Sequence, residues 1–169
     1  MSLASRSNVI VRKAGKDDVG ILGRFGAHLM SLHHEWDAER FIAAGNETPT
    51  AYSKWLDSQL RQNDVVILTA EEDGIAVGYT YAGLEGYDYM ALRGPAGVIH
   101  DIYVDPDRRR AGIGRTLLEA TINKLQELGA RQVVLSTAYT NAIAQRLFQA
   151  TGFRPTMIEM TRTLSIKPV

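Results

Sequence analysis

Apolar residues recur at strand and helix spacing in the first third of the chain. The run from Val9 to Arg12 predicts a short strand. Asp17 and Asp18 then stand where a helix cap is expected, ahead of a stretch with helical periodicity. Residues 35–49 have no steady period and predict a loop, after which a second helix is expected to end near Asn63. The apolar positions of these two helices are Ile21, Leu22, Phe25, Leu29 and Leu32, then Trp55, Leu56 and Leu60.

The middle of the chain is dominated by strand patterns. Residues 65–70 and 75–84 are rich in apolar and β-branched side chains and flank the turn-forming sequence Glu72-Asp73-Gly74, which predicts a hairpin. A loop is expected over 85–95. The largely apolar run 97–104 that follows predicts a strand buried on both faces.

The last third alternates between helix and strand. Apolar residues at helical spacing extend from about Gly112 to Leu128, a strand is expected over 132–137 and a helix over 141–150. The strand near residue 100 and that of 132–137 would be parallel, with the helix as their crossover, so the sequence predicts an α/β fold with a mixed sheet covered by helices. A final strand is expected over 156–164, with outward-facing Met157, Glu159, Thr161 and Thr163.

Composition limits the partners and the compartment. The 169 residues predict a single domain, with an ordered core from about residue 8 to residue 164. Lys+Arg and Asp+Glu are equal at 19 each, which leaves no overall field toward nucleic acid or an anionic membrane. The chain has no cysteine, hence no disulfide or thiolate metal site, and no apolar run of membrane-spanning length. We therefore expect a cytoplasmic protein. We also expect no bound metal, because adjacent His33 and His34 would point apart on a helix.

A glycine-containing turn follows the predicted strand of residues 97–104. Gly112 and Gly114 have no side chains to block a ligand, so backbone N–H groups of the turn can converge on an anion at the next helix N-terminus. The turn does not match a nucleotide P-loop, because Arg115 follows Gly114 where lysine is required. It also fails the dinucleotide fingerprint, since Leu117 stands at the third glycine position. The sequence therefore predicts a phosphate site of another type.

The spacing Arg109-x-x-Gly112-x-Gly114 resembles the cofactor motif of the GNAT superfamily of N-acetyltransferases. The segment 100–106 is similar to the family's central strand and its exit, and a second motif follows as Asn141-x-x-Ala144-x-x-Leu147-Phe148-x-x-x-Gly152-Phe153. The resemblance is best from about residue 65 to residue 164. It implies a mostly antiparallel twisted sheet with a parallel βαβ cofactor unit, acetyl-CoA as cofactor, and a homodimer.

Two residues of the predicted central strand are candidate general bases. Asp101 lies on an otherwise apolar strand, where it could take a proton from an amine directly or through water, or else hydrogen-bond a neighbouring loop or helix end. His100 is the second candidate, because histidine titrates near neutral pH, although a lone histidine is more often structural. No serine has a visible base partner and cysteine is absent, so direct attack in a ternary complex is expected.

The resemblance also implies roles in the second motif and in the cofactor site. Many members of the family carry a tyrosine general acid where this chain has Phe148, so Tyr139 or water would have to supply the proton. Asn141 is interpreted as a helix N-cap, a cofactor ligand, or both. The arginines near the turn could instead form a solvated charge run. The residues expected at the cofactor are Ile102, Tyr103, Val104, Arg109, Arg110, Ala111, Gly112, Ile113, Gly114, Arg115, Asn141 and Phe148.

The acceptor is expected to be a primary amine of a small molecule or a protein. Family architecture implies that residues 33–39 and 79–89 border the acceptor cleft, and their carboxylates and aromatic rings would suit a cationic amine. Two alternatives stay open. The protein could use another acyl-CoA, or it could be a non-catalytic acyl-CoA-binding regulatory module, for which Phe148 in place of tyrosine is the best support.

Overall fold

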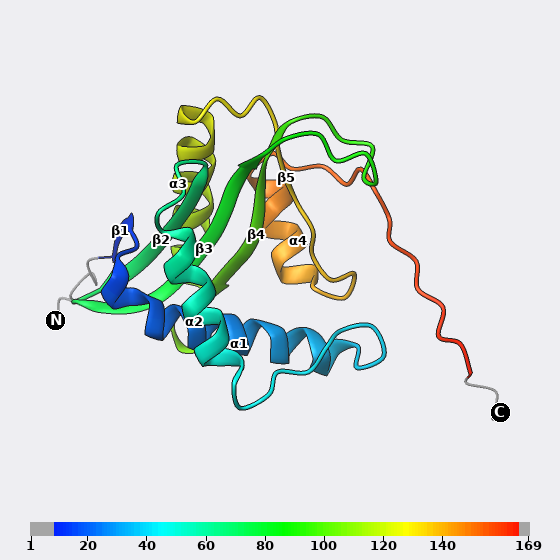
Figure 1. Cartoon of the computed structure of the whole chain (residues 1–169), viewed down its shortest axis with the longest axis horizontal. Coiled ribbons are helices and arrows are strands. Elements are labelled where there is room, and N and C mark those ends of the chain that lie inside the picture. Colours follow the sequence, from blue (N-terminus) through cyan, green and yellow to red (C-terminus); the bar gives the residue numbers. More distant parts are fainter. Residues whose placement is uncertain (1–8, 166–169) are drawn as a thin grey trace, which may run out of the picture.

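The computed structural model describes residues 9–165 and has a five-stranded sheet in the order β1-β2-β3-β4-β5 (Figure 1). Strands β1 to β4 are antiparallel neighbours, whereas β5 is parallel to β4, so the predicted mixed, mostly antiparallel sheet is confirmed. The strands are β1 (Val9–Lys13), β2 (Val65–Glu72), β3 (Ile75–Glu85), β4 (Ala96–Val104) and β5 (Val133–Leu135). The helices are α1 (Val19–Trp36), α2 (Thr48–Gln59), α3 (Ile113–Glu127) and α4 (Ala142–Ala150), with short 3-10 turns at Lys16–Asp18 and Pro106–Arg108.

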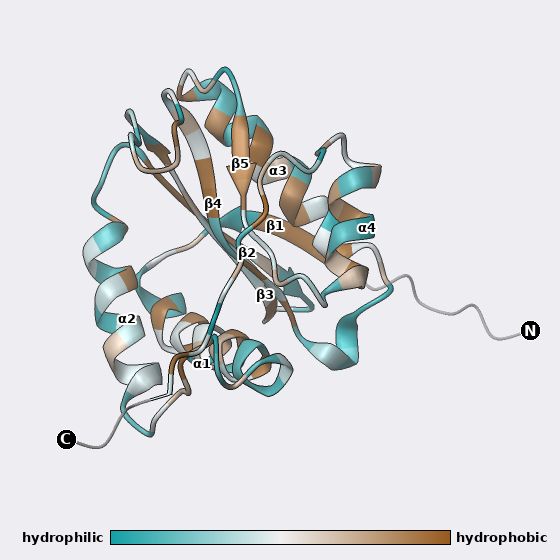
Figure 2. Ribbon diagram, turned by 90° about the vertical axis from the view of Figure 1, so that its right-hand side faces the viewer, coloured by the Kyte–Doolittle hydropathy of each residue, from teal (hydrophilic) through white to brown (hydrophobic). Residues whose placement is uncertain are grey.

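The sheet lies between two helical layers. Side chains alternate across β2: Val66 and Leu68 belong to the core beneath α3 and α4, and Ile67 to the core beneath α1 and α2. Strands β1, β4 and β5 are predominantly hydrophobic in Figure 2, whereas α2 is mostly hydrophilic. No helix within residues 9–165 combines the length and apolar character needed to cross a membrane.

The predicted βαβ unit consists of β4, α3 and β5. The two strands pair only where Gly97–Ile99 lie opposite Val133–Leu135, and β4 continues to Val104 without a partner on that side in the described chain. α3 begins at Ile113, directly after the glycine turn. The turn thus lies beyond the carboxyl end of β4, where parallel strands commonly bind ligands.

The predicted final strand is absent, so that prediction is wrong. Residues 153–165 lie outside helices and strands, and Figure 1 shows them leaving the body as an extended arm. The amino-acid pattern is that of a strand, but a ladder needs a neighbour to pair with its backbone groups, and none lies alongside in residues 9–165.

Some predicted bounds and contacts also change. α2 begins at Thr48, inside the predicted loop, because Pro49 is favourable in a first helical turn. Asp18 precedes α1 as predicted, but its carboxylate accepts hydrogen bonds from Arg12 and the Gly15 N–H instead of capping α1. β5 is shorter than the expected 132–137. β4 is not buried on both faces throughout, since His100 is exposed.

Candidate active site

The turn before α3 presents free backbone N–H groups. Arg110 and Gly112 both have positive φ, 68° and 81°, and a Cβ added at Gly112 would meet no atom within 4 Å. The first backbone hydrogen bond of α3 runs from the Thr116 N–H to the Gly112 carbonyl. The N–H groups of the residues just before Thr116 therefore have no carbonyl partner within the helix, as at any helix N-terminus. A turn with uncovered backbone N–H groups at a helix N-terminus can bind a pyrophosphate group.

The four arginines around the turn have different surroundings. Arg108 and Arg115 are each paired with a glutamate, at 3.2 Å and 2.8 Å. Arg109 donates from Nε to the Val104 carbonyl at 3.0 Å, which ties the turn to the end of β4. Arg110 has no hydrogen-bond or ion-pair partner among residues 9–165. The arrangement therefore favours Arg110 for contact with a phosphate, while the role of Arg109 in cofactor binding stays a prediction.

Asp101 lies on β4, on the face covered by α1 and α2. Its Oδ2 accepts hydrogen bonds from the hydroxyls of Tyr52 and Tyr79, the latter at 2.9 Å. Burial, followed by the nearby Asp101 carboxylate, raises the pKa of Tyr52 and of Tyr79, so both hydroxyls stay protonated donors at neutral pH. Within the described chain Asp101 Oδ1 has no hydrogen-bond partner. Asp101 therefore has one oxygen held in place by two tyrosines and another that the described chain leaves without a partner.

A cavity of about 280 Å³ opens beside Asp101. Its apolar wall comes from α1 and the loop that follows, and its polar wall from α2 and β4. The apolar wall contains Leu29, Met30, Phe41 and Ile42, and the rest of the lining is Gly26, His33, Thr48, Tyr52, His100 and Asp101. The lining includes neither lysine nor arginine.

A β-bulge brings His100 to the same cavity as Asp101. Tyr81 pairs with Asp101 and Ala82 with Ile99, so His100 is the extra residue on β4, and bulges redirect side chains in this way. The two candidate bases predicted from adjacent positions therefore line one cavity.

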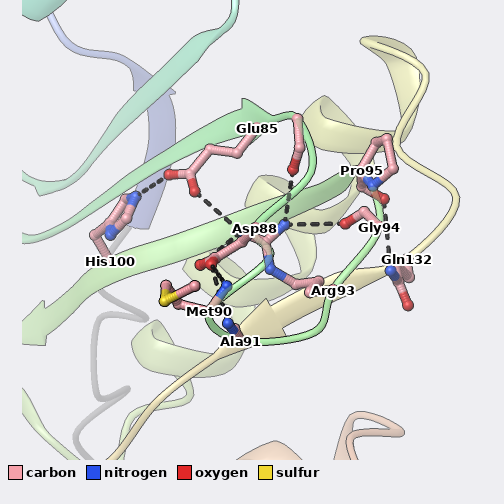
Figure 3. Close-up of polar contacts among 10 residues, drawn as sticks. Glu85, Asp88, Met90, Ala91, Arg93, Gly94, Pro95, His100 and Gln132 are labelled. Atoms are coloured by element: carbon pink, nitrogen blue, oxygen red, sulfur yellow. Dashed lines mark hydrogen bonds and ion pairs between the residues drawn. The ribbon is translucent and has the colours of Figure 1, made fainter.

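A network of polar contacts holds His100 (Figure 3). Its Nε2 lies 2.5 Å from Glu85 Oε1, and the same carboxylate lies 3.2 Å from the guanidinium of Arg93. Arg93 also reaches Asp88, whose Oδ1 accepts the N–H groups of Met90 and Ala91. Glu85, at the end of β3, therefore fixes the imidazole, and Arg93 of the loop between β3 and β4 holds Glu85. This arrangement fits a positioning role for His100 as well as a catalytic one.

Glycines on α1 allow α2 to approach and place Tyr52. A Cβ added at Gly26 would lie 2.1 Å from Tyr52 Cδ1, and one at Gly23 would lie 2.1 Å from Ser53 Oγ. Sequence reasoning missed Tyr52 as a site residue. The two glycines three residues apart on a predicted helix are the signal that could have indicated a close helix contact at this position.

We expect Gly26→Ala to reduce both turnover and stability, because the added methyl group must displace the Tyr52 ring that holds Asp101. The free energy of unfolding should fall by about 1–3 kcal/mol, the range for overpacking. Gly20→Ala is the matched control, since nothing lies within 4 Å of its added Cβ on the same helix. It should stabilise the protein by up to about 1 kcal/mol. Thermal unfolding and initial rates of the two variants test this, and equal turnover in both would contradict the role given to Tyr52.

The two candidate positions for a general acid differ sharply in exposure. Tyr139 lies in the loop before α4 and is 92% exposed, while Phe148 is 5% exposed and lies 6.0 Å from the ring of Phe153. Asn141 Oδ1 accepts the Ala144 N–H at 3.2 Å, so the predicted N-cap is present. Contacts of Asn141 and Phe148 with a cofactor, and proton donation by Tyr139, stay predictions.

Phe148→Tyr is expected to destabilise the protein by about 1–3 kcal/mol, because its hydroxyl would enter an apolar core without a partner. Phe153→Tyr is the control on the neighbouring ring, which is partly exposed, so the new hydroxyl can reach water. Chemical denaturation of both variants gives the comparison. If Phe148→Tyr were as stable as the parent and turned over faster, the position would be open to the site rather than part of the core.

The two regions expected to border the acceptor cleft contribute unequally. His33 lines the cavity and contacts the Leu29 carbonyl through Nδ1 at 2.8 Å, and buried Tyr79 reaches Asp101. Tyr87 and Tyr89 stack on each other at 5.9 Å on the exposed loop outside the cavity lining. The contribution of Phe41 and Ile42 to the apolar wall was not foreseen, because the loop after α1 has no periodic pattern.

The chain matches the family model described as "Acetyltransferase (GNAT) family" over residues 29–153. It belongs to the GNAT acetyltransferase family. An L-methionine sulfoximine/L-methionine sulfone acetyltransferase of Pseudomonas aeruginosa is 30% identical over 148 residues, which are 85% of this chain and 78% of that protein. An L-amino acid N-acyltransferase of Escherichia coli is 31% identical over 88 residues, covering 52% of this chain and 49% of that protein.

Solved structures share this GNAT fold. A tetramutant of a Bacillus halodurans protein superposes with a TM-score of 0.79 at 23% identity, covering 92% of this chain and 99% of that one. An aminoglycoside N-acetyltransferase in complex with CoA has a TM-score of 0.70 at 20% identity, covering 97% and 99%. The family resemblance and the fold predicted from the two motifs are thereby confirmed, as is acetyl-CoA, the cofactor used by GNAT acetyltransferases.

Proposed function

We propose that this protein transfers the acetyl group of acetyl-CoA to a primary amine of a small molecule bound in the cavity beside Asp101. The observation that carries the proposal is the Asp101 carboxylate, held on one oxygen by two tyrosines and free on the other, in the wall of that cavity. A protein amine would need to enter the same cavity through a flexible lysine or an N-terminus.

In the proposed reaction this chain's residues bind, orient and move a proton. Acetyl-CoA supplies the acetyl group as a thioester. The turn of residues 109–115 would hold the phosphates. The edge of β4 from Ile102 to Val104, which has no partner on the β5 side within residues 9–165, would hold the pantetheine arm and polarise the carbonyl. Asp101 would accept a proton from the ammonium form of the acceptor, directly or through water, and the neutral amine would then attack the thioester carbonyl in a ternary complex. When the C–S bond breaks, the new amide nitrogen would release its extra proton to water, and Tyr139 or water would protonate the CoA thiolate.

The cavity lining supports an acceptor with an apolar body. Leu29, Met30, Phe41 and Ile42 would cover that body, while Asp101 attracts the ammonium. A carboxylate on the acceptor would meet no lysine or arginine among the lining residues, and only histidines could carry positive charge there. The proposed acceptor is therefore a monoamine rather than an amino acid, in contrast to the substrates in the names of the two relatives above.

The test is thiol release from acetyl-CoA with amines in matched pairs. 2-Phenylethylamine against phenylalanine, and 3-methylthiopropylamine against methionine, differ only by the carboxylate. We expect kcat/KM to be at least about tenfold higher for the amine of each pair, which corresponds to about 1.4 kcal/mol. Methionine sulfoximine, an aminoglycoside and a lysine peptide complete the panel. Preference for the amino acids would overturn the acceptor class, and turnover with the peptide alone would make a protein the acceptor.

A further inference from the structure

Glu72, the last residue of β2, carries a buried charge that the proposed reaction does not use. Its side chain is only 9% exposed. A buried carboxylate loses hydration, which is unfavourable unless an oppositely charged group compensates for the loss. That group is Arg108, whose Nε lies 3.2 Å from Glu72 Oε2, and no other charged side chain of residues 9–165 pairs with Glu72. The position of Arg108 is therefore coupled to a fixed point on the sheet.

Arg108 lies directly before the glycine turn, so its ion pair connects that turn to β2. Two further contacts have the same effect. The Asp105 N–H donates to the Val77 carbonyl of β3 at 2.8 Å, and Arg109 Nε donates to the Val104 carbonyl of β4 at 3.0 Å. The segment that leads into the turn is thus tied to three neighbouring strands, and of these three contacts the one with β2 joins two charged side chains.

The turn depends on such contacts because part of its backbone is strained. Arg110 has a φ of 68° although it is not glycine, and it follows Arg108 by only two residues. A residue with a side chain is disfavoured in this conformation and keeps it only where the surrounding structure holds it. Arg110 is also the arginine whose surroundings favour contact with a phosphate. Contacts that hold Arg108 therefore help to set the shape of the phosphate site.

Two roles are conceivable for Arg108, and they differ in what happens to Glu72. The Arg108 side chain is 53% exposed, so its guanidinium is near enough to solvent to be drawn toward a phosphate. If Arg108 turned to the cofactor, however, the Glu72 carboxylate would stay behind on the sheet as a buried charge without a partner, which is strongly unfavourable. The geometry therefore favours an Arg108 that keeps its pair with Glu72 and supports the turn.

We propose that Glu72 is a positioning residue for acetyl-CoA. By holding Arg108 it keeps the turn of residues 109–115 in the shape that receives the phosphates, and Arg108 acts through the turn rather than by touching the cofactor. Glu72 lies on a different strand from the cofactor motif and more than thirty residues before it in the chain. This inference rests on the proposed placement of the phosphates at the turn and adds a residue that supports it.

The test is the affinity of Glu72→Gln for acetyl-CoA, measured by isothermal calorimetry. Glutamine keeps the size of the side chain and removes its charge. We expect the dissociation constant to rise about tenfold, because the cofactor must then order a turn that is no longer held in place. At saturating acetyl-CoA, kcat should stay within about twofold of the parent value, a split that a general loss of structure would not produce. Glu119→Gln is the matched control: it breaks the exposed pair with Arg115 and should not weaken binding.

The sign of the change separates the two roles of Arg108. If Arg108 bound a phosphate directly, Glu72 would compete for it, and Glu72→Gln would bind acetyl-CoA more tightly than the parent protein. Tighter binding, or an unchanged affinity, would overturn the proposal.

A double variant shows whether the two residues act as a unit. Arg108→Ala alone leaves the Glu72 charge buried and can fail to fold, whereas Glu72→Gln/Arg108→Ala removes both charges and avoids that cost. We expect the double variant to bind within about threefold of Glu72→Gln, since both changes break one contact. A further loss of about tenfold or more would assign Arg108 a contact of its own with the cofactor and overturn the proposal. Thermal unfolding of each variant shows that it is folded.

Gly112→Glu distinguishes a failure of this inference from a failure of the phosphate placement, because it changes the turn itself. If Gly112→Glu loses acetyl-CoA binding and Glu72→Gln keeps it, the phosphates lie at the turn and only the role of Glu72 is overturned. If Gly112→Glu binds acetyl-CoA like the parent protein, the placement of the phosphates is wrong and the role of Glu72 is overturned with it.

Discussion

Gly112→Glu is expected to weaken acetyl-CoA binding by at least about a hundredfold, or about 3 kcal/mol, while the protein stays folded. Any side chain at Gly112 starts from the uncovered face of the turn, where no atom lies within 4 Å. A carboxylate there would occupy the anion position and repel the phosphates. The positive φ of 81° adds about 1–2 kcal/mol of backbone strain, which a stable domain tolerates. Isothermal calorimetry with acetyl-CoA measures the loss.

Gly129→Glu is the matched control for that substitution. Gly129 also has positive φ, 98°, with open space around its added Cβ, and it follows the opposite end of α3. The added negative charge is less favourable at a helix C-terminus than at an N-terminus, so the control variant should be no more stable than Gly112→Glu. Its affinity for acetyl-CoA should match that of the parent protein. Equal affinities in both variants would remove the turn from the cofactor site.

Asp101→Asn is expected to lower kcat by about 10²–10⁴-fold, the usual contribution of a general base, with the affinity for acetyl-CoA changed by less than about threefold. Asparagine keeps an oxygen that can accept the hydroxyl hydrogen bonds of Tyr52 and Tyr79, so the local packing should survive. Assays of CoA release at fixed times, on protein shown by calorimetry to be folded, provide the measurement.

His100→Gln distinguishes the two candidate bases. His100 is held by Glu85 and lies on the ring of Tyr81 at 5.2 Å, so its replacement should alter acceptor binding more than the chemical step. We expect a higher KM for the amine with a kcat within about tenfold of the parent value. A loss of turnover in His100→Gln as large as that expected for Asp101→Asn, with Asp101→Asn itself active, would assign the base to His100.

Local sequence signals were sufficient for much of the fold. The hairpin of β2 and β3, the strand β4 and the helix α3 each have a strong local signal in composition, turn residues or spacing, and all four elements are found near the expected positions. The prediction of a strand over residues 156–164 was wrong because a strand needs a neighbouring strand, and no pattern within these residues reveals whether one exists. α2 begins earlier in the chain than predicted, with Pro49 in its first turn. This helix start was not recognised because the surrounding sequence has no regular pattern.

The site divides in the same way. The glycine turn and Asp101 are recognisable from residues adjacent in sequence, and Asp101 is indeed in a cavity wall. The hydrogen bonds that hold Asp101 could not be recognised from the sequence. Tyr52, Tyr79 and Asp101 come from three elements and meet only when α2 packs on α1 and β4 pairs with β3. The bulge at His100 likewise follows from pairing with β3 and has no local signature.

The most direct test of the account is the balance between CoA release and acetylated amine, measured by mass spectrometry in one reaction with acetyl-CoA and the preferred small amine. We predict equal amounts of CoA and N-acetyl product, no release above background without the amine, and loss of both in Asp101→Asn. Tight acetyl-CoA binding without an N-acetyl product from any small amine, amino acid, aminoglycoside or peptide would contradict the account and indicate a non-catalytic acyl-CoA-binding module.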